Sequence, residues 1–296
     1  MRTCAALVTA LLACGPVLAA SKEGAPVDAT GVELELKGPV RRVVSLAPSI
    51  TRQILELGLD DRLVGATIFC ELGEKSKVKR VGNMLQPSIE KIAALKPDLV
   101  LACKEGNRAP IGPKLRSLGL SLFVLDERKG FDDICGEFVL LGRMFGVKEK
   151  AETAVRKAKK RVEEIEKRLK KRPRVKVFLA YGTEPIVGAA EGTFGHELIE
   201  RAGGRNVSAA SRARYPRYGA ERLILKNPDV VLVVSMKGSA ERDRKKWLGM
   251  RGLRAAKTGG IHTIPADPVC APTPSTYCDG LEEMAGILHP EAFEEK

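Results

Sequence analysis

The chain has 296 residues, 44% of them hydrophobic, and its 50 Lys and Arg against 37 Asp and Glu give a formal net charge of +13. This length provides one large or two ordinary domains, and the hydrophobic content is ample for a packed core, which excludes a chain that is disordered throughout. Aromatic residues make up only 4% of the chain, too few for the stacking platforms that proteins use to bind single-stranded nucleic acids.

The first twenty residues have the layout of an export signal. A short basic start precedes an apolar run over residues 4–12, and Ala19 offers a cleavage site. The stretch Leu11-Leu12-Ala13-Cys14 also resembles the lipobox of bacterial lipoproteins, in which the Cys is acylated. We therefore predict a signal peptide over residues 1–19, or a lipoprotein signal that ends before Cys14. Either signal predicts a periplasmic location, and the second adds a lipid anchor.

Short apolar segments alternate with helical patterns along most of the chain. The segments predicted as strands are 43–46, 63–66, 98–103 and 122–125 in the first half, and 175–179, 186–188, 229–234 and 261–264 in the second. Such alternation is typical of a parallel sheet covered by helices. We predict two similar α/β lobes, over residues 20–146 and 174–296.

The excess positive charge lies between these lobes. Residues 148–176 carry a net charge of +9, whereas the parts before and after them carry +3 and +1. Apolar residues in this segment recur at helical spacing, at Ala151, Ala154, Val155, Ala158, Val162, Ile165 and Leu169. We predict a bridging helix over residues 147–173, nearly 40 Å long at about 1.5 Å per residue. Its charge is interpreted as a solvated face, so no nucleic-acid partner is expected.

A short motif is repeated in the two lobes. Glu90-Lys91-Ile92, followed by Pro97-Asp98, recurs as Glu221-Arg222-Leu223, followed by Pro228-Asp229, with the same spacing. Each copy predicts an amphipathic helix that begins with an acidic residue, stops before Pro and leads into a buried strand. An acidic first turn suits the positive end of a helix, so on its own the motif indicates two helix starts.

Sequence motifs for catalysis, phosphate binding and metal binding are absent. The three His have no second ligand at a metal-binding spacing, and there is no GxSxG, GxxxxGK[ST] or GxGxxG motif. We therefore predict no catalytic residue, no metal site and no cofactor. Cys270 and Cys278 are close enough in sequence to form a disulfide, with two small buried residues as the alternative.

The loops after the predicted strands hold the candidate ligand-binding residues, because ligands of open α/β sheets bind at the carboxyl ends of the strands. These candidates are Pro48, Phe69, Cys70, Cys103, Lys104, Tyr181, Tyr215, Asp267 and Tyr277. Three of the four Tyr are among them, although the chain is poor in aromatic residues. Placed between two facing lobes, the candidates predict a broad, partly apolar ligand.

Four segments, taken together, resemble the periplasmic binding proteins of ABC importers for cobalamin, siderophores and haem. The segments are RVVSLAPS at 42–49, DRLVG at 61–65, PSIEKI at 87–92 and LKPDLV at 95–100. The resemblance implies two Rossmann-like lobes joined by a single rigid helix, with the ligand in the cleft between them. It also implies a protein that passes its ligand to a membrane permease with an ATPase and catalyses nothing. A metal-inserting chelatase of similar two-lobed architecture is the enzyme alternative.

Within that family the chain is most similar to the cobalamin binders. Residues 102–107 and 177–182 align with their pocket segments, and the resemblance adds Met84 to the expected ligand contacts. The resemblance would lead us to expect Trp at the positions of Met84 and Cys103 and Arg near that of Ala271, so the chain departs from the cobalamin binders there. From the rest of the similarity, the expected ligand is cobalamin or a related corrinoid, with haem or a ferric siderophore as the alternative. Haem would need an axial Tyr or His in the cleft, and the Tyr candidates named above could serve.

The resemblance also gives the repeated motif a second meaning. In the family, one exposed Glu on each lobe docks against Arg residues of the permease. Glu90 and Glu221 stand at those two positions, so they are predicted to be paired docking points.

Overall fold

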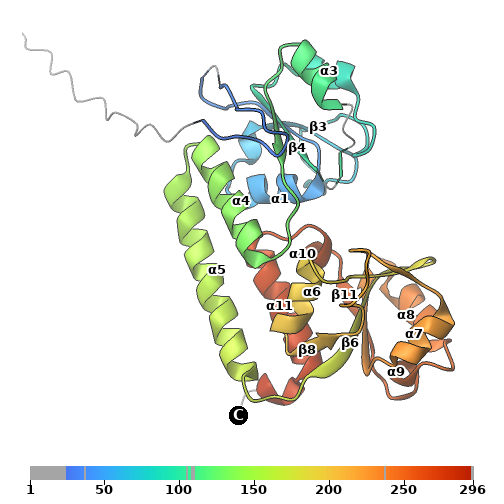
Figure 1. Cartoon of the computed structure of the whole chain (residues 1–296). Helices are drawn as coiled ribbons and strands as arrows, with labels where there is room; N and C mark the ends of the chain where they lie inside the picture. Colours follow the sequence, from blue (N-terminus) through green and yellow to red (C-terminus); the bar gives the residue numbers. More distant parts are fainter. Residues whose placement is uncertain (1–24, 37, 105, 108–110, 237, 295–296) are drawn as a thin grey trace, which may run out of the picture.

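The computed structural model describes residues 25–36, 38–104, 106–107, 111–236 and 238–294. These residues form two α/β lobes, with a long helix running beside both of them (Figure 1). The predicted signal over residues 1–19, including Cys14, lies outside the described residues. No helix in the described ranges is both long enough and apolar enough to cross a membrane.

The first lobe is built on a parallel sheet. Its described strands lie in the order β3-β2-β1-β4-β5, and each neighbouring pair is parallel. The strands are β1 (Val43–Ser45), β2 (Leu63–Ala66), β3 (Lys79–Arg80), β4 (Leu99–Cys103) and β5 (Leu122–Leu125). The lobe's helical segments are α1 (Pro48–Glu56), η1 (Asp60–Arg62), α2 (Ile89–Ala94) and α3 (Ile111–Ser117). The four strands predicted here are confirmed, and only the two-residue β3 was not predicted.

The second lobe has a mixed sheet rather than the purely parallel one that was predicted. Its path is β11-β10-β6-β7-β9, with β8 also paired to β6, and β7 runs antiparallel to both of its neighbours. The strands are β6 (Val175–Thr183), β7 (Ile186–Gly188), β8 (Gly204–Asn206), β9 (Arg217–Tyr218), β10 (Val230–Ser235) and β11 (Ile261–Pro265). Only Glu184 and Pro185 separate β6 from β7, and two residues can close a hairpin but cannot make the crossover that parallel strands need.

The helices of the second lobe vary in length. They are α6 (Phe194–Arg201), α7 (Ala220–Lys226), α8 (Ala240–Leu248), α9 (Arg254–Lys257), α10 (Asp267–Cys270), α11 (Pro274–Leu288) and η2 (Pro290–Ala292). The last of the α-helices packs against the bridge between the lobes as well as against its own lobe (Figure 1).

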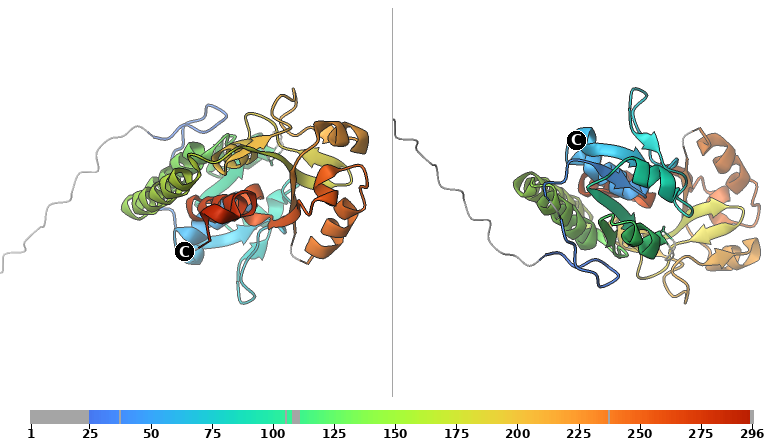
Figure 2. Two further views of the ribbon diagram at one scale, coloured as in Figure 1. Left: turned by 90° about the horizontal axis from the view of Figure 1, so that it is seen from below. Right: turned by 90° about the horizontal axis from the view of Figure 1, so that it is seen from above.

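The bridge consists of α5 (Lys148–Leu169) with α4 (Phe131–Met144) packed beside it. With 22 residues, α5 is about 33 Å long. Six of the seven apolar positions predicted to face the core are buried, while Ala154 is half-buried. The prediction placed the end of the bridge at residue 173, but the helix ends at Leu169 and the last residues before Pro173 form a turn. The views from below and above show α5 at one side of both lobes (Figure 2).

One continuous apolar core runs through both lobes and the bridge. Alternate residues of a strand face opposite sides of its sheet, so Leu99 and Leu101 in β4, and Val177 and Leu179 in β6, point into this shared core. The residues between them face separate cores beneath each lobe's own helices. Because the shared core would have to be opened for the lobes to move far apart, we expect small changes in lobe orientation.

Two glycines of α4 provide a test of the bridge packing. A Cβ atom built on Gly142 lies 2.5 Å from Cβ of Ala151 in α5, whereas one built on Gly136 meets nothing within 4 Å. Gly136→Ala should therefore raise the free energy of unfolding by about 0.5–1 kcal/mol, because Ala favours a helix over Gly. Gly142→Ala should lower it by about 1–3 kcal/mol, because it overpacks the helix contact. Chemical denaturation of both variants measures the two values, and equal effects would show that the helices are not in close contact.

Candidate ligand-binding cleft

A cavity of about 300 Å³ lies between the two lobes. The carboxyl ends of the parallel strands of both lobes lead toward it, as expected for this class of sheet. Its first-lobe lining is Ala47, Pro48, Ser49, Arg52, Phe69, Glu71, Met84, Cys103, Gly106 and Arg128. Its second-lobe lining is Met236, Ala266, Asp267, Cys270 and Ala271.

Most of the cavity wall is apolar, and two of its large side chains are unusually exposed. Phe69 is 60% exposed and Met236 is 68% exposed, although both are hydrophobic. They belong to opposite lobes, since Phe69 follows β2 and Met236 directly follows β10. Exposed apolar groups at the edge of a cavity are typical of a ligand-binding site, because the ligand covers them when it binds.

An ion-pair cluster connects the lobes at the cavity. Arg52 in α1 forms a salt bridge with Asp267 at the start of α10, and another with Glu71 at 3.1 Å. The side chain of Arg52 is only 18% exposed, so the two carboxylates balance a charge that is mostly shielded from water. This cluster holds the lobes in contact on one side of the cavity.

A second arginine lies almost completely buried at the cavity. Arg128 is 5% exposed, and its guanidinium lies 4.0 Å from the carboxylate of Glu137 in α4. The same carboxylate accepts a hydrogen bond from the side-chain amide of Gln53. The position of Arg128 in the cavity wall offers hydrogen-bond donors to a carboxylate, phosphate or amide oxygen of a ligand.

The thiol of Cys270 lies next to the same ion pairs. Part of this residue is exposed, but burial of the thiol raises its pKa to about 11. The charge of Asp267 raises this pKa further, and that of Arg52 lowers it. The thiol is therefore protonated at neutral pH. The described residues contain no group of three or more His, Cys, Asp or Glu side chains that could hold a metal ion.

The structure brings half of the ten predicted ligand-binding residues to the cavity: Pro48, Phe69, Met84, Cys103 and Asp267. Cys70 lies outside the cavity lining: it is 1% exposed, and its sulfur lies within hydrogen-bond distance of the hydroxyls of Thr51 and Thr67, so its role in binding stays a prediction. Lys104 lies outside the cavity and forms an ion pair with Asp126 at 3.0 Å. Lys104 instead lines a groove on the surface of the first lobe, together with Asp126.

Tyr277 also lies outside the cavity lining, so its role in binding stays a prediction. It lies in α11 rather than in a loop and is completely buried, with its ring stacked on Phe131 at a centroid distance of 4.7 Å. Burial and the nearby charge of Glu197 raise the pKa of its hydroxyl. Thr273 and Thr276 form a capping box at the start of α11, which explains why the loop ends before Tyr277.

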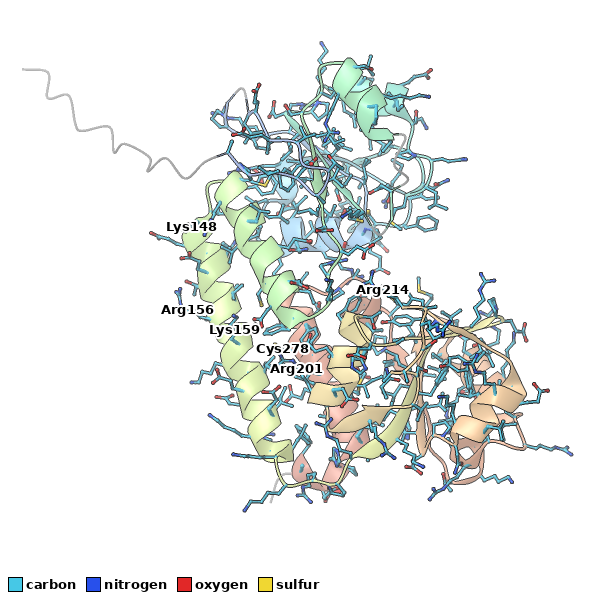
Figure 3. The ribbon with its side chains drawn as sticks, viewed as in Figure 1. Lys148, Arg156, Lys159, Arg201, Arg214 and Cys278 are labelled. Atoms are coloured by element: carbon cyan, nitrogen blue, oxygen red, sulfur yellow. The ribbon has the colours of Figure 1, made fainter. Side chains whose placement is uncertain are left out.

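Tyr181 and Tyr215 form a pair outside the described cavity lining. Their rings meet edge to face at a centroid distance of 5.7 Å, and Tyr215 is 40% exposed. The neighbouring Arg214 lies at the edge of the second lobe that faces the first (Figure 3), where it forms a 2.6 Å ion pair with Glu127. The two tyrosines are thus placed beside a contact between the lobes, and their role in binding stays a prediction.

The predicted disulfide between Cys270 and Cys278 is absent, and both cysteines carry thiols. Cys270 lines the cavity, whereas Cys278 is buried in α11 (Figure 3). The thiol of Cys278 donates to the carbonyls of Pro274 in its own helix and Ala158 in α5. The two side chains therefore belong to different environments despite their short sequence separation.

Glu90 and Glu221 occupy equivalent places in the two lobes. Glu90 lies in the first turn of α2 and Glu221 in the first turn of α7, and both are exposed. The helix starts that the repeated motif predicted are confirmed. The role of these residues as docking points stays a prediction.

The cavity also contains residues that the sequence did not single out, chiefly Arg52, Arg128 and Met236. Met236 directly follows β10, so the rule that ligands bind after strand ends would have found it. Arg52 lies within a helix, and the local sequence carries no signal that its side chain reaches the opposite lobe.

The sequence profile of the periplasmic binding protein family matches residues 43–268. The chain belongs to this family. The vitamin B12-binding protein of Vibrio cholerae is 27% identical over 252 residues, which cover 84% of this chain and 90% of that protein. An ABC transporter substrate-binding lipoprotein of Bacillus subtilis is 27% identical over 276 residues, which cover 90% of this chain and 86% of that protein.

Solved structures of such binding proteins have the same fold. That of the periplasmic vitamin B12-binding protein of Vibrio cholerae superposes with a TM-score of 0.74 at 26% identity, covering 87% of this chain and 99% of that chain. A periplasmic haem-binding protein from Pseudomonas aeruginosa gives a TM-score of 0.77 at 23% identity, covering 85% of this chain and 93% of that chain. The two-lobed architecture is therefore that of the family.

Proposed function

We propose that this protein captures cobalamin or a related corrinoid outside the cytoplasm and delivers it to the permease of an ABC importer. The observation that carries the proposal is the cavity between the lobes, whose apolar wall includes exposed Phe69 and Met236 on opposite sides. A flat macrocycle presents two broad apolar faces, one for each lobe. The B12-binding relatives, which align over most of their length, support this ligand class.

The size of the cavity limits how such a ligand is held. Its volume of about 300 Å³ is at the lower end of the range for small-molecule sites. A corrinoid is larger than this, so it would extend beyond the enclosed space onto the exposed apolar rim. The ion pairs of Arg52 and Arg214 between the lobes would have to adjust as the ligand enters, which requires only small changes in lobe orientation.

The protein would act by binding and release and would catalyse no reaction. Export by the predicted signal would place it on the outer side of the membrane, where the ATPase-driven permease receives the ligand. Glu90 and Glu221 are the proposed contacts with that permease.

Haem is the second candidate, and one observation favours it. Tyr and His are not the only axial ligands of haem iron: Met and Cys thiolate also serve, and both residue types line the cavity. The tyrosine candidates offer less support, because Tyr277 is buried and the other two lie outside the described cavity lining.

Calorimetric titration of the mature protein with cyanocobalamin, cobinamide, haem and a ferric siderophore tests the proposal. We expect saturable binding of the two corrinoids, with at least tenfold weaker binding of the other ligands, equivalent to about 1.4 kcal/mol. Tighter binding of haem, accompanied by a shifted Soret band, would favour the second candidate. Binding of the siderophore alone would contradict both.

A further inference from the structure

The cavity between the lobes is unusually rich in sulfur. Four of its fifteen lining residues are Met84, Cys103, Met236 and Cys270. The whole chain contains only 7 Cys and 6 Met among 296 residues, so a random set of fifteen would contain about one. Other sulfur residues lie elsewhere: Cys135 and Met284, for example, are buried in the core. The enrichment is therefore a property of the cavity.

The four sulfur side chains are divided evenly between the lobes. Met84 and Cys103 belong to the first lobe, and Met236 and Cys270 belong to the second. The thioether of Met84 lies directly beside Gly106, where a Cβ atom would come within 2.6 Å of the sulfur. Cys103 is the last residue of β4, and Cys270 is the last residue of α10. Each face of the cleft thus has one Cys and one Met in its lining, with Cys103 buried and Cys270 exposed.

This arrangement has a chemical consequence for a metal held in a flat macrocycle. The ring supplies the metal's equatorial ligands, so its two axial positions point away from the ring faces. A ring placed between the lobes would therefore direct one axial position toward each pair of sulfur side chains. Thiolates are strong ligands for polarizable metal centres, and thioethers are weaker ones.

We propose that the cleft prefers corrinoids with an exchangeable axial ligand, and that the thiol of Cys103 or Cys270 takes that position on the cobalt. This inference rests on the proposed function. In the step, the cobalt–oxygen bond of an axial water breaks and a cobalt–sulfur bond forms. The thiol proton passes to solvent, and the cobalt remains Co(III), so neither oxidant nor reductant is needed. Metal binding by a thiol normally releases a proton in this way.

The test compares aquocobalamin, whose axial water exchanges, with cyanocobalamin, whose cyanide is held firmly. Aquocobalamin should bind on the order of tenfold more tightly than cyanocobalamin. Its visible absorption bands should shift on binding, because sulfur replaces oxygen on the cobalt. Cyanocobalamin should bind without such a shift. Both affinities are measured by calorimetry and the bands by absorption of the same samples.

Variants identify the sulfur that binds. The shift, and with it the preference for aquocobalamin over cyanocobalamin, should be lost in Cys103→Ala or in Cys270→Ala. The matched control is Cys135→Ala, which removes a buried thiol outside the cavity lining. Met84→Leu and Met236→Leu preserve volume and should keep the shift. Circular dichroism verifies that each variant is folded.

Three results would overturn the inference. The first is normal binding of both cobalamins with no shift for aquocobalamin, which leaves the proposed function intact. The second is a shift that persists when both cysteines are replaced. The third is an absence of binding by any corrinoid, which would overturn the proposed function as well.

Discussion

Corrinoid uptake should be abolished when Glu90 and Glu221 are both replaced with Ala, whereas the Kd for the corrinoid should stay within twofold of the original. Both carboxylates are exposed in the first turns of their helices, and neither residue lines the cavity. A carboxylate and a guanidinium form a bidentate, orientation-specific contact, so one such contact on each lobe fixes the pose on a permease. Removing both carboxylates should therefore prevent docking on the permease and leave the ligand-binding cleft unchanged.

The measurement combines two assays on the same variants. Uptake of labelled corrinoid is measured in cells that contain the transporter, and Kd is measured by calorimetry on the purified protein. Glu241→Ala is the control, because it removes an exposed carboxylate of α8 that pairs only with Lys245 among the described residues. Unchanged uptake by the double variant would refute the docking role. A large loss of affinity for the corrinoid would show that the two residues contribute to the ligand site instead.

Glu197→Ala should lower the free energy of unfolding by about 2–3 kcal/mol, because Glu197 of α6 connects the second lobe to both helices of the bridge. Its carboxylate accepts a 2.6 Å hydrogen bond from the backbone N–H of Phe131 at the start of α4. It also accepts a 2.8 Å bond from Arg201, which in turn binds Glu166 of α5 at 2.7 Å. Figure 3 shows Arg201 in the space between α5 and the second lobe. Removing one partner leaves a partly buried charge and an orphaned N–H group.

The pKa of Arg201 points to the same network. Burial lowers this pKa, but the hydrogen bond and charge of Glu197, together with the charge of Glu166, outweigh that effect and raise it above its usual value. Denaturant unfolding measures the loss. Glu241→Ala serves again as the control: it breaks an ion pair of the same i,i+4 spacing between side chains that are 72% and 73% exposed, so it should cost less than about 0.5 kcal/mol. Equal losses in the two variants would show that the Glu197 network does not join the second lobe to the bridge.

Much of the fold could be predicted from the sequence because its signals are local. Each of the eight predicted strands is an apolar segment long enough to stand out, and each is present in the structure. The bridging helix was visible from the spacing of residues such as Val155, Val162 and Ile165. The strands that were missed, β3, β8 and β9, have two or three residues and contain Lys or Arg. Their pairing depends on neighbouring strands rather than on their own sequence.

The site was predictable only in part, because its composition depends on how the lobes face each other. Phe69, Cys103 and Asp267 follow or end strands, and all three line the cavity. The same rule did not bring Tyr277 to the cavity, because the capping box at Thr273 starts a helix before it. Arg52 pairs with Asp267 of the other lobe, a contact between distant segments that no local pattern encodes, and Arg128 lies in a loop that does not directly follow a predicted strand end.

The calorimetric titration with cyanocobalamin tests the central claim most directly. One cleft per chain predicts a single saturable site with a stoichiometry of one, and covering the exposed rim at Phe69 and Met236 predicts a negative change in heat capacity. Replacing both rim residues with Ala should weaken binding by at least tenfold, while the fold is retained. Folded protein that gives no binding heat with any corrinoid at several temperatures would contradict the claim that the cleft is a corrinoid site.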